Sequence, residues 1–135
     1  MRPRLTAILT LAFVGFICIS CGGIVDPSQN QMDAISGTIS PGGSRLHPFS
    51  ASKTGELTVK LGNLSPASQP LIGVQWVQAA GDGTCNGGLM QSNQFAPANT
   101  TAITGQISSG NYCIIIYDSV GLVQPENYTG TISHP

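Results

Sequence analysis

The chain has 135 residues, which is enough for one domain with short flanking segments. Charged residues make up only 8% of it, and five basic residues against six acidic ones give a net charge of −1. This composition excludes a nucleic-acid-binding protein that relies on a basic surface, and it excludes a long acidic tail. With 41% of its residues apolar, the chain still has the side chains for a packed core.

The N-terminus has the order of a secretory signal peptide. Arg2 and Arg4 precede segment 5–19, in which 12 of 15 residues are apolar, and Ser20 stands before Cys21. A basic start, a short apolar run and a small residue at the cleavage site are typical of such signals. A transmembrane helix would need about 20 apolar residues, so the run is too short for that alternative. We therefore predict that residues 1–20 are removed on export.

Residues 18–23, with the sequence Cys-Ile-Ser-Cys-Gly-Gly, resemble the lipobox of bacterial lipoproteins. The resemblance implies that Cys21 becomes the lipidated first residue and that the lipid anchors the protein to a membrane. The family prefers leucine three positions before that cysteine, where this chain has Cys18. Gly22 after the cysteine is compatible with sorting to the outer membrane of a diderm bacterium. Secretion without a lipid, with Cys21 as a spare thiol, is the alternative.

The predicted mature chain has three basic and six acidic side chains, a net charge of 3 − 6 = −3. This charge gives no attraction to nucleic acid or to an anionic membrane surface, so membrane attachment has to come from the lipid. Residues 21–33 lack a hydrophobic period and contain Pro27, Ser28 and Asn30. They predict a flexible tether, which leaves 34–135 as the domain.

Two cysteines, Cys85 and Cys113, remain in the domain. An even pair in an exported protein predicts a disulfide. Two cysteines are too few for a structural zinc site, which takes four ligands, and the two histidines are distant in sequence. The bridge would close a loop of about 29 residues, for which loop entropy gives roughly 3.5 kcal/mol of stabilisation.

The domain consists of short apolar segments separated by Gly, Pro, Asn and Ser, with no helical period. Segment 56–61 alternates between apolar and polar residues, as a half-buried strand does. Segment 111–117 is the strongest strand and is apolar on both faces, whereas the glycine-rich 84–90 is the weakest. The predicted strands are 34–40, 44–51, 56–61, 71–79, 84–90, 102–107, 111–117 and 126–133.

This pattern predicts an all-β fold, an antiparallel β-sandwich of about eight strands that is jelly-roll-like. Pro48 cannot donate a backbone hydrogen bond, so segment 44–51 is expected at a sheet edge. Tyr112 and Cys113 are adjacent, so the Tyr-x-Cys corner of immunoglobulin domains is absent and that topology is disfavoured.

The order of several short motifs resembles the bacterial pre-peptidase C-terminal-like domain over positions 35–134. The resemblance implies a β-sandwich that accompanies secreted enzymes without being catalytic. The family usually carries acidic residues in its middle strand, where this chain has Val74–Val77, so a calcium role is not carried over. The motifs are Ile35–Ile39, Arg45–Phe49, Gly55–Val59, Ser109–Asp118 and Tyr128–Ile132.

The sequence contains few residues that could form a catalytic or metal-binding site. Nothing places His47 or His134 beside a particular serine, and we expect both to be incidental surface residues. The loop around Asp82 has one carboxylate, too few for calcium unless the disulfide brings Asp118 to it. No catalytic residue, metal site or cofactor is therefore predicted.

Trp76 is the only tryptophan, and with Tyr117 it would offer a sugar-stacking platform if both were exposed. In a strand, Trp76 would point to the same face as Ile72 and Val74, which favours burial of its ring instead. The predicted function is therefore a non-catalytic, lipid-anchored envelope module with a structural or protein-interaction role. The alternative is a glycan-binding module that uses exposed aromatic residues.

Overall fold

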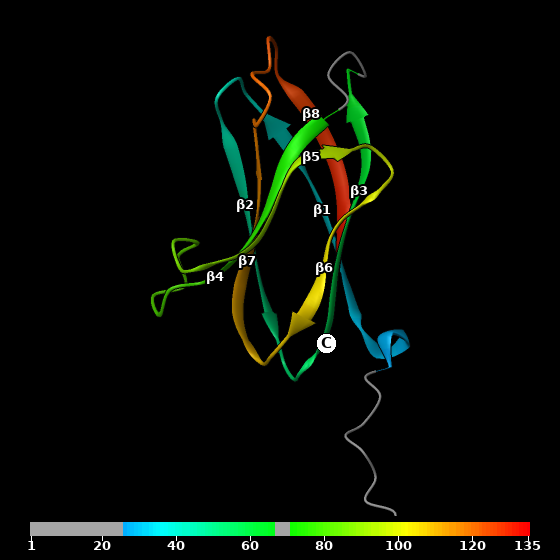
Figure 1. The fold of residues 1–135 in the computed structure, drawn as a ribbon, viewed down its shortest axis with the longest axis vertical. Helices are drawn as coiled ribbons and strands as arrows, with labels where there is room; N and C mark the ends of the chain where they lie inside the picture. Colours follow the sequence, from blue (N-terminus) through cyan, green and yellow to red (C-terminus); the bar gives the residue numbers. More distant parts are fainter. Residues whose placement is uncertain (1–25, 67–70) are drawn as a thin grey trace, which may run out of the picture.

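The computed structural model describes residues 26–66 and 71–135, which form an all-β protein (Figure 1). The predicted signal peptide, 1–20, and the predicted lipidation site, Cys21, lie outside the described residues. The elements are the 3-10 turn η1 (Pro27–Gln29) and the strands β1 (Gln31–Ile39), β2 (Ser44–Ala51), β3 (Gly55–Ser65), β4 (Leu71–Gln78), β5 (Leu89–Pro97), β6 (Thr101–Ile107), β7 (Gly110–Tyr117) and β8 (Glu126–His134). No helix among these residues has the length and apolarity needed to span a membrane.

The strands form two four-stranded antiparallel sheets with the strand order of a jelly roll. Sheet A has the order β1-β8-β3-β6, and sheet B has the order β2-β7-β4-β5. The pairs β1·β8, β2·β7, β3·β6 and β4·β5 are nested, so the chain follows a long hairpin rolled into two layers. The predicted β-sandwich is confirmed.

Alternate residues of the strands fill the space between the sheets. In β3 the side chains of Leu57, Val59 and Leu61 are buried, while Glu56 and Lys60 are exposed. The same alternation in the other strands builds one continuous apolar core. Each large apolar side chain that is fully buried contributes about 1.5–3 kcal/mol, so this core is the main source of stability.

The predicted strands differ from the observed ones most at β1 and β5, and β3 runs four residues further than predicted, to Ser65. β1 begins at Gln31, so the last three residues of the expected tether belong to sheet A. The predicted strand 84–90 is wrong: residues 79–88 form a loop, and the strand is β5. β5 is an edge strand in which only Ala96 is buried, so its sequence shows no apolar alternation that could have revealed it.

The chain crosses from sheet A to sheet B between β6 and β7, where the Tyr112 hydroxyl donates to the carbonyl of Ser108 at 3.1 Å. This bond matches the tyrosine corner of immunoglobulin domains in kind, although the sequence lacks the Tyr-x-Cys pattern. β2, which contains Pro48, is an edge strand of sheet B as predicted.

Candidate functional site

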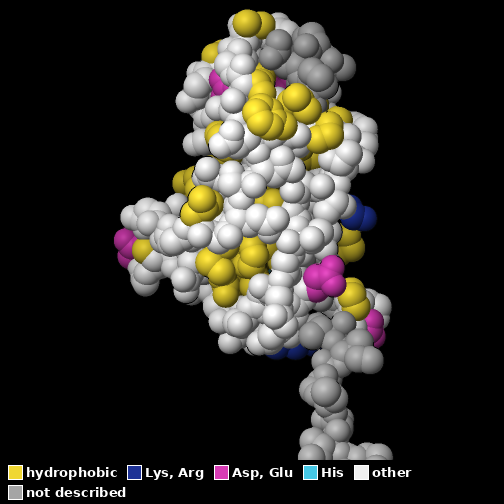
Figure 2. Space-filling view, viewed as in Figure 1, with side chains coloured by type: hydrophobic (Ala, Val, Ile, Leu, Met, Phe, Trp, Pro, Cys, Tyr) yellow, Lys and Arg dark blue, Asp and Glu magenta, His cyan; other side chains and the backbone are white. Residues whose placement is uncertain are grey.

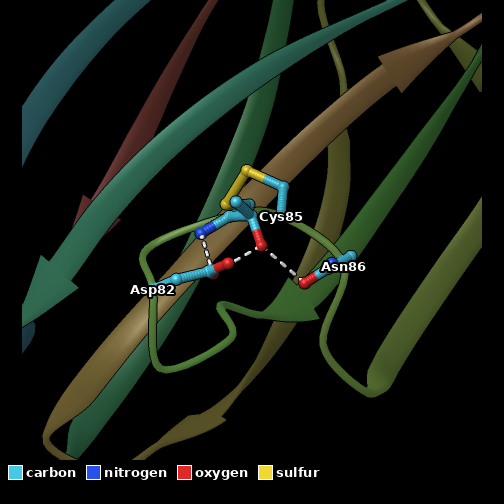
Figure 3. The surroundings of a disulfide bond; sticks show 5 residues. Asp82, Cys85 and Asn86 are labelled. Atoms are coloured by element: carbon cyan, nitrogen blue, oxygen red, sulfur yellow. Dashed lines mark hydrogen bonds between the residues drawn. A yellow bond between two sulfur atoms is a disulfide. The ribbon is translucent and has the colours of Figure 1, made fainter.

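The candidate site is the loop 79–88 between β4 and β5, called the clamped loop here because a disulfide holds it to β7. Cys85 in the loop and Cys113 in β7 are bonded, with a Cα–Cα distance of 5.5 Å (Figure 3). Cys113 points to the outer face of sheet B, opposite Pro48 on one side and Val77 on the other. The predicted disulfide is confirmed, and it fixes a glycine-rich segment to the most apolar strand.

Side chains at alternate positions also shape the clamped loop (Figure 3). The carboxylate of Asp82 accepts the backbone N–H of Thr84 at 2.9 Å and the Thr84 hydroxyl at 2.6 Å. These hydrogen bonds from Thr84 lower the pKa of Asp82, because they favour the ionised carboxylate. The side-chain amide of Asn86 lies 2.6 Å from the same hydroxyl. Three polar side chains thus order a loop that has little apolar surface to bury.

Backbone contacts close the base of the clamped loop. The N–H of Gln78 donates to the carbonyl of Gly88 at 2.9 Å, and the N–H of Ala79 donates to the carbonyl of Asn111 in β7 at 2.9 Å. A Cβ atom at Gly87 would overlap the Gln78 carbonyl, so only glycine fits there. Figure 2 shows the loop as a projection from the side of the molecule.

A groove of about 300 Å³ runs beside the clamped loop. The loop contributes Gly83 to one wall, and β2 and β7 contribute Ser50 and Asn111, whose side chains are hydrogen-bonded at 2.8 Å. The Ser50 hydroxyl donates to the Asn111 oxygen, which leaves the Asn111 amide protons directed elsewhere. Among the residues that the structure describes, no charged side chain lines this groove. Its chemistry suits a neutral ligand with hydrogen-bond acceptors, and the disulfide holds one of its walls in place.

The predicted aromatic pair does not form a platform. Trp76 is 4% exposed and faces the core, where Gly105 on β6 leaves space for its indole ring. Tyr117 points to the outer face of the same sheet, and its ring covers Gly73. Successive residues of a strand point to opposite faces. Trp76 is paired with Ile114, three residues before Tyr117, so the two aromatic side chains lie on opposite faces of sheet B. Burial of Trp76, which its parity predicted, is confirmed.

The two aspartates considered for calcium lie far apart in the fold. Asp82 belongs to the clamped loop, beside the end of β4, whereas Asp118 follows β7 at the start of β4. The Asp118 carboxylate accepts the backbone N–H groups of Gly42 and of the three residues 120, 121 and 122. Desolvation is the largest single influence on the pKa of Asp118 and raises it, but these hydrogen bonds together outweigh it and lower the pKa. Among the described residues, no group of three or more His, Cys, Asp or Glu is placed to hold a metal ion.

The prediction that both histidines are surface residues is wrong. His134 is 2% exposed, and its Nε2 lies 3.0 Å from the Asp33 carboxylate, which lowers the pKa of Asp33. His47 is half-buried, and its Nε2 lies 2.6 Å from the Tyr128 hydroxyl. Burial lowers the pKa of His47. Both rings point inward from their strands and have structural partners.

Two of these features were missed by sequence reasoning for different reasons. Tyr128 and Ile132 were expected to face inward. His134 lies an even number of residues from both, so the same alternation would have predicted its burial. No sequence pattern indicated the groove beside the clamped loop, because three segments that are distant in sequence form it.

Comparison of the chain with protein-family models and with curated proteins finds no match. The class of protein is therefore defined by the fold, a single jelly-roll β-sandwich with a disulfide-clamped loop. The likeness to lipoproteins and to the pre-peptidase C-terminal-like domain stays a prediction from the sequence.

Proposed function

We propose that the mature protein is a non-catalytic, lipid-anchored module of the bacterial envelope that works by binding another protein through the clamped loop. The N-terminal order of a basic start, an apolar run and Ser20–Cys21 supports export and lipidation of Cys21. Gly22 supports an outer-membrane location. The low charge of the chain favours a lipid over electrostatics as the means of attachment.

The observation that carries the binding role is the construction of the clamped loop. Its ten residues bury little, yet a disulfide, the Asp82–Thr84 hydrogen bonds and the glycine at position 87 all fix its shape. Binding residues are commonly placed on loops that a rigid scaffold positions. Preorganisation of this kind strengthens binding because less conformational entropy is lost on association.

The histidines support a non-catalytic role. His47 is hydrogen-bonded to Tyr128 and His134 to Asp33, so each ring already has a structural partner. General base catalysis needs a ring nitrogen within hydrogen-bond reach of a nucleophile.

A glycan-binding role is the second candidate, and the uncharged groove favours it. Ser50 and Asn111 offer a hydroxyl and an amide beside Pro48, a combination that suits a sugar ring with polar edges and an apolar face. This candidate uses the groove in place of the Trp76 and Tyr117 platform.

Photo-crosslinking in cells tests the proposal. A photoreactive residue at position 86 in the clamped loop should capture a discrete protein, and one at position 104 on the outer face of sheet A should not. The double variant Cys85→Ser/Cys113→Ser should lose the product. Equal products from both positions would contradict protein binding by the loop, and retention of purified protein on a glycan array, abolished by Asn111→Ala, would support the second candidate.

Mass spectrometry tests the anchor separately. The mature protein should begin at Cys21 and carry diacylglycerol, and Cys21→Ser should release it from membranes. A mature protein that begins elsewhere, with no effect of Cys21→Ser, would overturn this part of the proposal.

A further inference from the structure

The described chain begins at one end of the sandwich, called the N-terminal pole here (Figure 1). Asp26 accepts the N–H of Ser28 at 3.0 Å and caps η1. The Asn30 side chain donates to the carbonyl of Glu56 at 2.8 Å and to the Ser133 hydroxyl at 3.1 Å. These contacts tie the first described residues to the sandwich, and four residues, 22–25, lie between Asp26 and Cys21 in the sequence.

This short connection limits how far the body can lie from the membrane. Five residue steps from Cys21 to Asp26 span at most about 18 Å. β8 runs towards the N-terminal pole and has nine residues, which at about 3.3 Å each place the opposite pole roughly 30 Å further away. The two poles therefore differ strongly in their access to the bilayer.

The two poles also differ in surface chemistry. Near the N-terminal pole, hydrogen bonds from Ser28 are the main cause of the lowered pKa of Asp26, and the charge of the nearby Lys53 adds to it. Ser52 and Thr54 flank Lys53 and are exposed. At the opposite pole Val123 is 80% exposed, and Figure 2 shows hydrophobic side chains gathered at that end, around the end of β5. Asp26 and Lys53 give the N-terminal pole one charge of each sign, and Met32 beside it is 66% exposed, a mixed surface that suits the headgroup layer of a membrane.

The clamped loop lies nearer to the N-terminal pole. Gly110, the first residue of β7, pairs with Ala51, the last residue of β2, next to the turn at that pole. Cys113 is three residues further along β7, or roughly 10 Å. The loop projects sideways from the long axis of the molecule (Figures 1 and 2).

From this arrangement, and resting on the proposed lipidation and loop binding, we infer that the protein stands on the membrane on its N-terminal pole. The lipid headgroup layer contacts the surface around Lys53. With the pole on the headgroups, Cys113 at the base of the clamped loop lies roughly 10 Å above them, and a fully extended tether limits that height to about 28 Å. The loop then points along the membrane. Its partner is a protein held at the same membrane.

Energy transfer on vesicles tests the orientation. The full-length lipidated protein is inserted into phosphatidylcholine vesicles with a headgroup acceptor dye, and a donor is placed at residue 53 or residue 123. Transfer should be several-fold stronger from residue 53. A flexible linker of about 20 residues inserted between Val25 and Asp26 should make the two signals similar, because such a linker no longer fixes the pole.

The outcomes separate this inference from the proposed function. Protein that fails to associate with vesicles, or Cys21→Ser protein that stays associated, contradicts the lipid anchor. Anchored protein with equal transfer from both positions, or stronger transfer from residue 123, overturns the orientation while the anchor stands. If photo-crosslinking from residue 86 captures only a soluble protein, the partner part is overturned; a membrane-held protein whose capture falls with the longer linker supports it.

Discussion

β7 and β8 occupy matching places, each inside a four-stranded sheet, but they use their two faces differently. β7 is apolar on both faces: Ile114 and Ile116 enter the core, and Cys113 is buried on the outer face under the clamped loop. β8 has polar residues on both faces: Thr129 and Thr131 point outward to the surface of sheet A. The clamped loop covers the outer face of β7 at Cys113, whereas Ile115 and Tyr117 on the same face stay partly exposed.

The inward face of β8 contains polar groups that need partners inside the sandwich. Tyr128 is hydrogen-bonded to His47, and His134 to Asp33. Glu126 is fully buried, and among the described residues neither of its carboxylate oxygens has a hydrogen-bond partner. β7 and β8 are therefore stabilised by different means, β7 by a disulfide to the clamped loop and β8 by side-chain hydrogen bonds.

The largest effect is expected from the cover of β7. Cys113→Ser should lower the free energy of unfolding by about 2–5 kcal/mol, because the reduced chain gains loop entropy when it unfolds. Denaturant unfolding measures this loss, and hydrogen exchange should rise first in residues 79–88. Thr131→Ser on the outer face of β8 is the control and should change stability by less than about 0.5 kcal/mol. Stability equal to the control would show that the bridge does not stabilise the cover.

The fit of the clamped loop against β4 can be tested without touching the disulfide. Gly87→Ala places a Cβ atom against the Gln78 carbonyl and should cost about 1–3 kcal/mol, as overpacking does. Gly88→Ala is a matched control, since a Cβ atom there meets nothing within 4 Å. Thermal unfolding of the two variants should differ clearly, and equal melting temperatures would contradict the tight closure of the loop.

The hydrogen bonds inside β8 are tested by Tyr128→Phe, which leaves the half-buried His47 nitrogen without its partner. A loss of about 1–3 kcal/mol is expected. Burial raises the pKa of Tyr128 to about 12, although the Arg45 charge opposes the shift. The folded state therefore holds its proton more tightly than the unfolded chain, and wild-type stability should fall as the pH rises from about 10 to about 12.

The matched control is Tyr117→Phe, whose hydroxyl lies on the outer face of sheet B, 3.5 Å from the Ser92 hydroxyl. Its cost should stay below about 0.5 kcal/mol. If both phenylalanine variants lose the same stability in urea, the hydrogen bond between Tyr128 and His47 contributes nothing of its own.

The smallest effect is expected at Glu126, where substitution should raise the free energy of unfolding instead of lowering it. Burial raises the pKa of Glu126, so the folded state binds a proton more tightly than the unfolded chain. Wild-type stability should fall as the pH rises above about 4.3, at about 1.4 kcal/mol for each unit of the raised pKa. Glu126→Gln removes this titration and should be more stable than wild type at neutral pH.

Urea unfolding at several pH values between about 5 and about 8 measures the difference. Glu56→Gln removes a carboxyl from the outer face of sheet A and controls for the change in net charge. A Glu126→Gln protein that is less stable than wild type at neutral pH would show that the carboxylate is ionised and partnered.

The sequence by itself determined the all-β class, most of the strands and the disulfide. Alternation in 56–61 depends only on neighbouring residues, and so does the apolar character of 111–117. The pairing of Cys85 with Cys113 followed because these are the two cysteines of the predicted domain once Cys21 is assigned to the lipid. The alternation of side chains along a single strand also depends only on neighbouring residues, and it correctly predicted that Trp76 lies in the core.

Only the tertiary structure decided which faces are covered and which segments meet. β5 is a strand because β4 offers it an edge, although its own residues lack alternation. His47 and Tyr128, 81 positions apart, meet because β2 and β8 face each other across the sandwich. The groove arises in the same way from β2, β7 and the clamped loop. Such contacts depend on strand order and on the packing of two sheets, which no short segment of sequence contains.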